Sequence, residues 1–172
     1  MEFDKFVIGF EGLKLGEHDY KFLVDTAFFK ELEYSEIQEG KVIVDAVLIK
    51  TERLMELDMS FEGEVIVPCD RCGEDLKQKV DFQETVVIKF DDEADEDQGM
   101  IVLKRGETDF DISHYIFESI ILSLPSRKVH AEIEGEPRCD EALMAKINSS
   151  NKSNDNDNDN IDPRWAALKN LK

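Results

Sequence analysis

The stretch M-E-L-D-M-S-F-E-G-E-V-I-V, residues 55–67, decides the fold class of this 172-residue chain. Its apolar residues occupy alternate positions from Met55 to Val67, and acidic or small polar residues fill most of the positions between them. A period of two indicates a β-strand with one face on a core and the other in water. Gly63 interrupts the apolar row where a bulge or bend is natural, and Pro68 ends the strand.

Further strands are predicted on both sides of this stretch. Residues 41–49 carry aliphatic side chains in both alternating sets around Asp45, which predicts a strand buried on both faces. Residues 76–90 alternate again, and residues 101–103 are suited to an edge strand. Three long strands that follow one another favour an antiparallel meander.

Helices are expected at two places in the first 130 residues. Asp25 can cap a short helix that follows a strand over residues 20–24. A longer helix is expected to start after Asp109 or Asp111, and it must stop before Pro125 because the residue preceding a proline disfavours helical geometry. This longer helix can cover the apolar face of the sheet.

The chain is expected to contain one domain, a linker and a tail. Strands followed by a packing helix indicate an α+β domain over residues 1–147, with an antiparallel meander sheet packed by one long helix plus short helices. Residues 148–160 contain only Asn, Ser, Lys and Asp, which cannot bury enough surface to fold and predict a disordered linker. Residues 161–172 predict a short helix, with Asp162 as N-cap and Pro163 at the first helical position.

The tail helix is too short to be stable alone, because isolated helices below about 12 residues are marginal in water. Its apolar side chains should therefore dock on another surface. The candidate partner-binding residues are Arg164, Trp165, Leu168 and Leu171. The alternative, in which the tail folds back on its own domain, stays open.

The charge of the chain restricts its partners. A formal net charge of −19 disfavours autonomous binding to naked nucleic acid and favours a basic protein partner. Part of this charge lies in an acidic block, residues 91–97, which is most simply read as a solvated loop. The sequence also lacks a secretion signal and an apolar run of about 20 residues, so we expect a cytoplasmic protein with no membrane contact.

Three cysteines without an export signal favour reduced thiols or a metal site over disulfides. Cys69 and Cys72 form a CxxC pair between two predicted strands, followed by a glycine, as in a metal knuckle. His130 and Cys139 are the remaining candidates, and together the four form a Cys₃His set of the kind that binds zinc. Ordinary thiols without a metal remain an alternative, as does redox chemistry, although a redox CxxC normally leads into a helix.

Motifs for catalysis are missing from the sequence. It has no phosphate-binding loop, dinucleotide-binding glycine motif, nucleophile elbow or H-E-x-x-H zinc motif. His18 and His114 have no cluster of ligands or nucleophile at a recognised spacing, so we assign them no role. We therefore expect neither an enzyme nor a small-molecule substrate.

Three segments together resemble the YceD family, and the likeness extends over nearly the whole chain. They are residues 63–72 (GEVIVPCDRC), residues 118–125 (ESIILSLP) and residues 162–169 (DPRWAALK). Many family members carry additional cysteines after the long helix, whereas this chain has only Cys139 there. Val129-His130 followed by Cys139 matches members with a Val-His before a single late cysteine.

The resemblance implies a role in accumulation of the large-subunit ribosomal RNA, and so in ribosome assembly, without enzymatic activity. The implied partners are ribosome-assembly components, such as a basic ribosomal protein, with direct contact to ribosomal RNA left open. Two other hypotheses remain beside this one. They are a thiol oxidoreductase that uses Cys69 and Cys72, and a zinc-stabilised adaptor that presents the helix around Trp165 to a partner.

Overall fold

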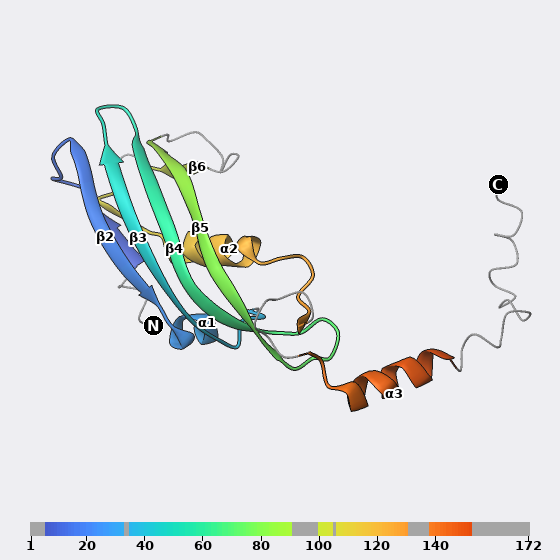
Figure 1. Cartoon of the computed structure of the whole chain (residues 1–172). Coiled ribbons are helices and arrows are strands. Elements are labelled where there is room, and N and C mark those ends of the chain that lie inside the picture. The colour runs from blue at the N-terminus through green and yellow to red at the C-terminus, as the bar shows by residue number, and fades with distance from the viewer. Residues whose placement is uncertain (1–5, 33–34, 91–99, 105, 131–137, 153–172) are drawn as a thin grey trace, which may run out of the picture.

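The computed structural model describes residues 6–32, 35–90, 100–104, 106–130 and 138–152. A five-stranded sheet forms the larger part of the fold, and most of the other elements lie behind one of its faces (Figure 1). In chain order the elements are β1 (Val7–Gly9), β2 (Gly16–Val24), α1 (Thr26–Glu31), β3 (Glu39–Lys50), β4 (Met55–Pro68), β5 (Asp75–Phe90), β6 (Met100–Leu103), β7 (Asp109–Asp111), α2 (Ser113–Ser123) and α3 (Glu141–Lys152).

The strands of the large sheet follow the order β2-β3-β4-β5-β6. The first four are antiparallel neighbours, as the meander prediction requires, with Val44 opposite Phe61 and Phe61 opposite Phe82. The predicted edge strand is β6, which runs parallel to the end of β5 with Ile101 opposite Ile88. The remaining strands, β1 and β7, pair with each other in a separate two-stranded sheet. The predicted α+β fold class is confirmed.

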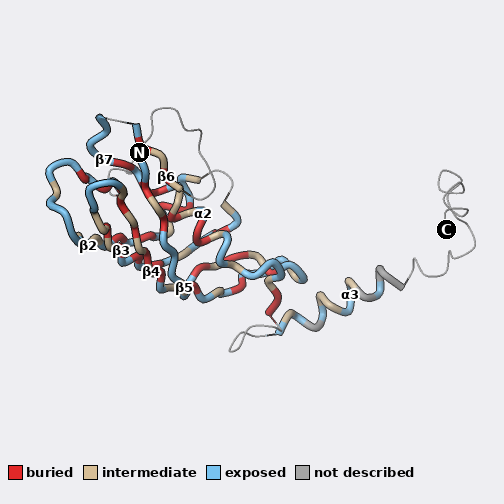
Figure 2. The backbone as a smooth tube through the Cα atoms, turned by 90° about the horizontal axis from the view of Figure 1, so that it is seen from above, coloured by how far each residue is buried: buried red, intermediate tan, exposed pale blue. Residues whose placement is uncertain are grey.

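The core lies between the large sheet and the elements behind it, where Figure 2 shows the buried positions. α2 contributes Ile116 and Ile120, both fully buried. The Phe61 ring stacks on Phe82 with 4.3 Å between ring centroids. Burial of each large apolar side chain contributes about 1.5–3 kcal/mol. The core-facing side chains of β4 are at most 2% exposed, and they are Met55, Leu57, Met59, Phe61, Val65 and Val67.

The outer face of β3 corrects one prediction. Its sequence suggested burial on both faces, but only the set facing α2 is buried. On the other face Ile43 is 36% exposed, and Val47 and Ile49 are half-buried. Within the described part of the chain no second layer of helices or strands covers that face, so aliphatic side chains there meet solvent.

Gly63 provides a second correction, because it forms no bulge. The ladder passes through it in register, with Val42 opposite on β3 and Val80 opposite on β5. A Cβ at this position would lie 2.2 Å from the Lys41 carbonyl oxygen. The position therefore requires glycine because the neighbouring strand approaches it so closely.

α1 begins at its predicted cap, Asp25, whereas the N-cap of α2 is Ile112, which makes no side-chain cap hydrogen bond, and the predicted Asp111 stands one residue before it. The Asp25 carboxylate accepts from the N–H groups of Ala27 and Phe28, at 2.9 and 3.2 Å, at the start of α1. At α2 the carboxylate of Asp111 accepts from the N–H of Ser113 at 2.8 Å. Each carboxylate satisfies N–H groups that a helix start leaves without intrahelical partners.

α3 continues to Lys152, so it includes the first residues of the segment 148–160 for which we expect a linker. The acidic block 91–97 lies outside the described residues, and so does the tail 161–172. The four candidate partner-binding residues therefore have no described placement; they are Arg164, Trp165, Leu168 and Leu171. Of the helices in the described ranges, none has the length and apolar character needed to cross a membrane.

Candidate metal centre

The CxxC segment forms a tight knuckle at the tip of the β4–β5 hairpin. Cys69 follows Pro68, the last residue of β4, and its N–H donates to the Glu74 carbonyl at 2.8 Å. The Gly73 N–H donates back to the Cys69 carbonyl, also at 2.8 Å. Gly73 has φ +75°, in the left-handed region that glycine adopts without strain. The knuckle leads into β5 instead of a helix, as the sequence predicted.

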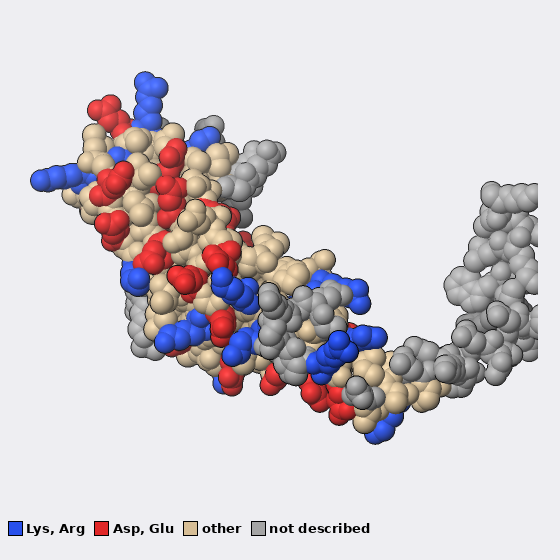
Figure 3. Space-filling model, viewed as in Figure 1, with Lys and Arg blue, Asp and Glu red and all other residues tan. Residues whose placement is uncertain are grey.

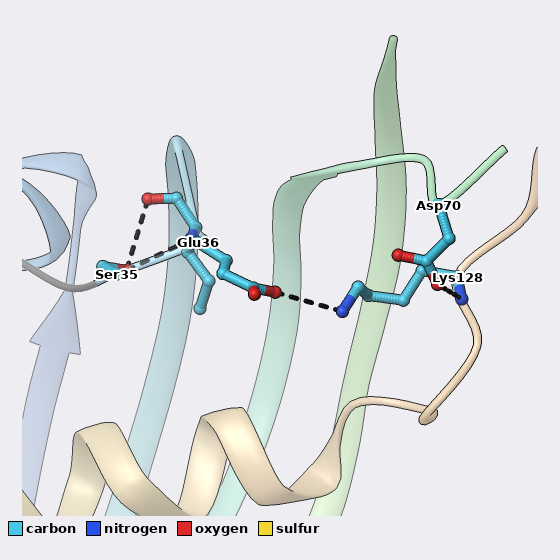
Figure 4. A network of polar contacts seen from close by, with 5 residues as sticks. Ser35, Glu36, Asp70 and Lys128 are labelled. Atoms are coloured by element: carbon cyan, nitrogen blue, oxygen red, sulfur yellow. Dashed lines mark hydrogen bonds and ion pairs between the residues drawn. The ribbon is translucent and has the colours of Figure 1, made fainter. Parts of the chain in front are cut away.

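The loop after α2 is tied to this knuckle through Lys128. The Asp70 N–H donates to the Lys128 carbonyl at 2.8 Å, and the Asp70 carboxylate accepts from the Lys128 N–H. The Lys128 ammonium reaches the Glu36 carboxylate at 3.1 Å, with Ser35 beside it (Figure 4). These contacts hold the two residues that follow Lys128 against the hairpin tip, so His130 lies next to the knuckle.

His130 is 4% exposed, and a backbone carbonyl orients its ring. Its Nε2 lies 3.1 Å from the Asp75 carbonyl oxygen, which can only accept, so Nε2 carries the proton and donates. In a neutral imidazole Nδ1 then keeps its lone pair. That atom lies 3.5 Å from the Cys72 sulfur and 3.7 Å from the Cys139 sulfur. A metal-binding histidine is commonly oriented in this way by its second nitrogen.

Cys139 connects this cluster to α3. Its sulfur lies 3.9 Å from that of Cys69. The next residue, Asp140, accepts from the Ala142 N–H at 2.7 Å through its carboxylate and from the Met144 N–H at 2.9 Å through its carbonyl. Asp140 thereby caps α3, and Cys139 lies directly before this cap.

The donor set fits a tetrahedral metal ion. The ligand atoms of Cys69, Cys72, His130 and Cys139 all lie within 4.8 Å of one another. Zinc bonds of about 2.3 Å to sulfur and about 2.0–2.1 Å to nitrogen place tetrahedral ligands about 3.8 Å apart for two sulfurs and about 3.5 Å apart for sulfur and nitrogen. The contacts of 3.9, 3.5 and 3.7 Å match these separations. The four residues can therefore bind a metal.

The two CxxC thiols have pKa values displaced in opposite directions. Burial raises the pKa of Cys69, but the N–H groups of Arg71, Cys72 and His130 donate to its sulfur, and the balance lowers the pKa to about 6. Burial and the neighbouring sulfurs of Cys69 and Cys139 raise the pKa of Cys72 to about 11. The Cys69 thiolate therefore forms readily. Deprotonation of Cys72 as well would place a second negative charge beside it, which a bound cation would compensate.

The structure brings together all four residues of the proposed Cys₃His set. The other two histidines lie elsewhere: His18 contacts the Lys14 carbonyl, and His114 pairs with Glu118 one helical turn away. The sequence did not indicate the supporting residues, which are Asp70, Lys128, Glu36 and the Asp75 carbonyl. Asp70, which lies between the two CxxC cysteines, was the one of these that the sequence could have pointed to. The Asp75 carbonyl could not have been predicted, because every residue has a backbone carbonyl.

Comparisons with known proteins identify a family. No curated protein matches the chain, and no solved structure matches it. The family model described as large ribosomal RNA subunit accumulation protein YceD matches residues 57–172. This match covers most of the chain and includes the knuckle, His130, Cys139 and the tail. The chain belongs to the YceD family.

Proposed function

We propose that this chain is a non-enzymatic, cytoplasmic ribosome-biogenesis factor that promotes accumulation of the large-subunit ribosomal RNA by binding. The match to a family described by that role carries the proposal. The partners are ribosome-assembly components, among them a basic ribosomal protein, because a net charge of −19 favours a cationic surface over a phosphate backbone. No membrane and no small-molecule substrate take part.

The metal centre of this factor is proposed to be a structural zinc site. Four protein ligands complete a tetrahedral shell, whereas a catalytic zinc keeps one position for water or substrate. The buried Cys69 and His130 side chains also restrict access from solvent. When bound, the ion would hold the β4–β5 hairpin, the loop after α2 and the start of α3 together. A centre of this kind stabilises a binding module and supplies no reaction.

The tail is proposed to carry partner contacts. Trp165, Leu168 and Leu171 follow a helical spacing, and Arg164 adds a cation beside them. Because aromatic and arginine side chains dominate the binding energy of many protein interfaces, Trp165 is the residue to test first. The linker segment 148–160 would let this tail reach a partner while the domain stays docked elsewhere.

The experiment uses a strain that lacks this chain, with the ratio of large-subunit to small-subunit ribosomal RNA as readout. The wild-type chain should restore the ratio, whereas Trp165→Ala and Cys72→Ser should restore it only in part. Leu15→Ala, at an exposed loop position, serves as the control. An unchanged ratio in the strain without the chain would contradict the proposal.

A thiol oxidoreductase that uses Cys69 and Cys72 is the second candidate, favoured by the N–H groups around the Cys69 sulfur, which lower its pKa to about 6. Such an enzyme would reduce a disulfide substrate to two thiols while two of its own thiols become a disulfide. Thiol counting before and after treatment with a small disulfide, followed by a dithiol reductant, separates the two functions. Rapid, reversible loss of two thiols in the metal-loaded protein would favour the oxidoreductase, and protected thiols would favour the structural zinc site.

A further inference from the structure

The large sheet has one face that no described element covers. α2 and the β1–β7 pair lie behind it, and the side chains of β2 to β5 alternate between that core and the opposite, open face (Figure 1). In Figure 3, which looks onto the open face, acidic side chains run down its middle and basic side chains lie mostly around them. Unlike a core face, this surface combines charges with exposed aliphatic groups.

Two rows of side chains across the strands define the half of this face near the β3–β4 turn. One row runs Glu17, Ile49, Glu56, Val87, and the next runs Asp19, Val47, Asp58, Thr85. Carboxylates therefore alternate with aliphatic side chains along the first row, and the second row follows the same order except that it ends in Thr85. We name this surface the acid–aliphatic face; it comprises Glu17, Asp19, Asp45, Val47, Ile49, Glu56, Asp58 and Val87.

Two carboxylates towards the other end of the open face pair with lysines, whereas most carboxylates of the acid–aliphatic face have no such pair among the described residues. Towards the knuckle end, Lys77 pairs with Glu64 at 3.6 Å, and Lys79 pairs with Asp81. Within the described ranges, Asp45 is the one carboxylate of the acid–aliphatic face with such a partner, Lys21 at 2.8 Å. Among the described residues no lysine or arginine pairs with its other carboxylates, which are Glu17, Asp19, Glu56 and Asp58.

A shallow hollow of about 370 Å³ lies within this face. Its lining includes the carboxylates of Asp45 and Asp58 and the aliphatic side chain of Val47. Asp58 is held in place because one of its oxygens accepts from the Thr85 hydroxyl at 2.6 Å. Long cationic side chains combine an apolar stem with a charged head, so lysine and arginine match both components of this lining.

We propose that the acid–aliphatic face docks a lysine- or arginine-rich segment of a protein partner. Cationic heads would pair with the unneutralised carboxylates, and the stems and any aliphatic residues between them would pack on Val47, Ile49 and Val87. A nucleic acid is a poor fit because its phosphates meet negative charge on this face. The inference rests on the proposed function, for which it names the surface and the chemistry of the partner.

The test measures binding of a fluorescein-labelled 12-residue peptide, with arginine alternating with valine, by fluorescence anisotropy on the full chain. Asp19→Lys with Glu56→Lys reverses two charges on β2 and β4, and should weaken binding about tenfold or more. The matched control, Glu31→Lys with Glu118→Lys, makes the same change in net charge on α1 and α2 and should weaken it by about twofold or less. Asp19→Asn with Glu56→Gln is the milder variant if charge reversal disturbs folding.

Equal weakening by the face and control variants would overturn the proposal, because net charge alone would then explain binding. Unchanged binding by the face variant would overturn it as well. A labelled 12-nucleotide RNA is measured in parallel, and tighter binding of the RNA than of the peptide at the same salt would assign the surface to a nucleic acid instead.

The same variants in the ribosomal RNA assay separate this inference from the proposed function. If the wild-type chain restores the RNA ratio and the face variant restores it equally well, the docking face is refuted and the function stands. If the wild-type chain fails to restore the ratio, the proposed function is refuted. The peptide measurement then still tests whether the acid–aliphatic face binds a basic segment. Loss of restoration in the face variant alone supports both.

Discussion

Removal of the metal from the Cys₃His centre should lower the free energy of unfolding by at least about 4 kcal/mol, the contribution of the longest tether alone. The perturbation is an excess of chelator added to the metal-loaded wild-type chain. A bound ion would link Cys72 to His130, which are 58 positions apart. In the chain-entropy treatment of cross-links, closing a loop of this length removes about 14 cal/mol/K from the unfolded chain, or about 4 kcal/mol at 25 °C.

A single ligand substitution should cost less. Cys139→Ser leaves Cys69, Cys72 and His130 to hold the ion and removes only the tether between His130 and residue 139. That tether spans 9 positions, for which the same relation gives about 2.6 kcal/mol. The expected order of stability is therefore wild type with metal, then Cys139→Ser with metal, then either protein after chelation.

The assays are urea unfolding and thermal unfolding, both followed by circular dichroism, with metal content determined by elemental analysis of the same samples. Chelation of a chain of this size should lower the melting temperature by at least about 8 °C, since 1 kcal/mol corresponds to about 2–4 °C. A double variant, Cys69→Ser with Cys72→Ser, lacks half of the ligands and should not respond to chelator. This control separates removal of the bound ion from any general effect of the reagent.

Two results would refute this reasoning. The first is wild-type protein that binds no zinc when prepared without chelator. The second is about one zinc per chain whose removal leaves the unfolding curve unchanged, because a bound ion linking three segments must stabilise the folded state. A metal-dependent change of similar size in the double variant would also show that the ion binds elsewhere.

Three further substitutions and one control test the fold by urea unfolding and circular dichroism. Gly63→Ala should destabilise the domain by about 2–3 kcal/mol, because its Cβ would meet the Lys41 carbonyl oxygen at 2.2 Å. Gly9→Ala, which has no atom within 4 Å of its Cβ, should change stability far less. Asp25→Ala should cost about 1 kcal/mol through loss of the α1 cap, and an unchanged unfolding midpoint would contradict that assignment. Asp140→Ala should reduce helix content by shortening α3, and undiminished ellipticity at 222 nm would contradict the cap described for it.

Most of the sheet was predictable because its signal is local. Alternation from Met55 to Val67 indicates a half-buried strand, whichever strands pair with it. Strands joined by short connections usually pair with their neighbours in the sequence, which predicts the order of the meander. The candidate ligands were also identifiable, since the chain has only three cysteines and three histidines. His130 was chosen because it precedes Cys139 on the loop after the long helix.

The missed features depend on contacts between distant segments. β1 and β7 are three-residue strands about a hundred positions apart, and so short a run carries no reliable periodicity. Aliphatic side chains on both sides of β3 suggested two covered faces, but composition cannot show whether a second layer exists. The His130 tautomer follows from the Asp75 carbonyl, which only the folded chain places beside the ring.

The metal centre and the acid–aliphatic face occupy separate parts of one sheet. β4 and β5 contribute to both, with the knuckle joining them at one end and Glu56, Asp58 and Val87 near the other. Loss of the ion would release the loop around His130 and the start of α3, but continuous ladders on both sides of β4 would still hold the face in register. In this proposal the bound ion would govern stability and the start of α3, whereas the acid–aliphatic face would govern affinity for a basic segment. The two proposals can therefore be tested separately, because substitutions on the acid–aliphatic face should change binding of the basic segment without changing the metal-dependent stability.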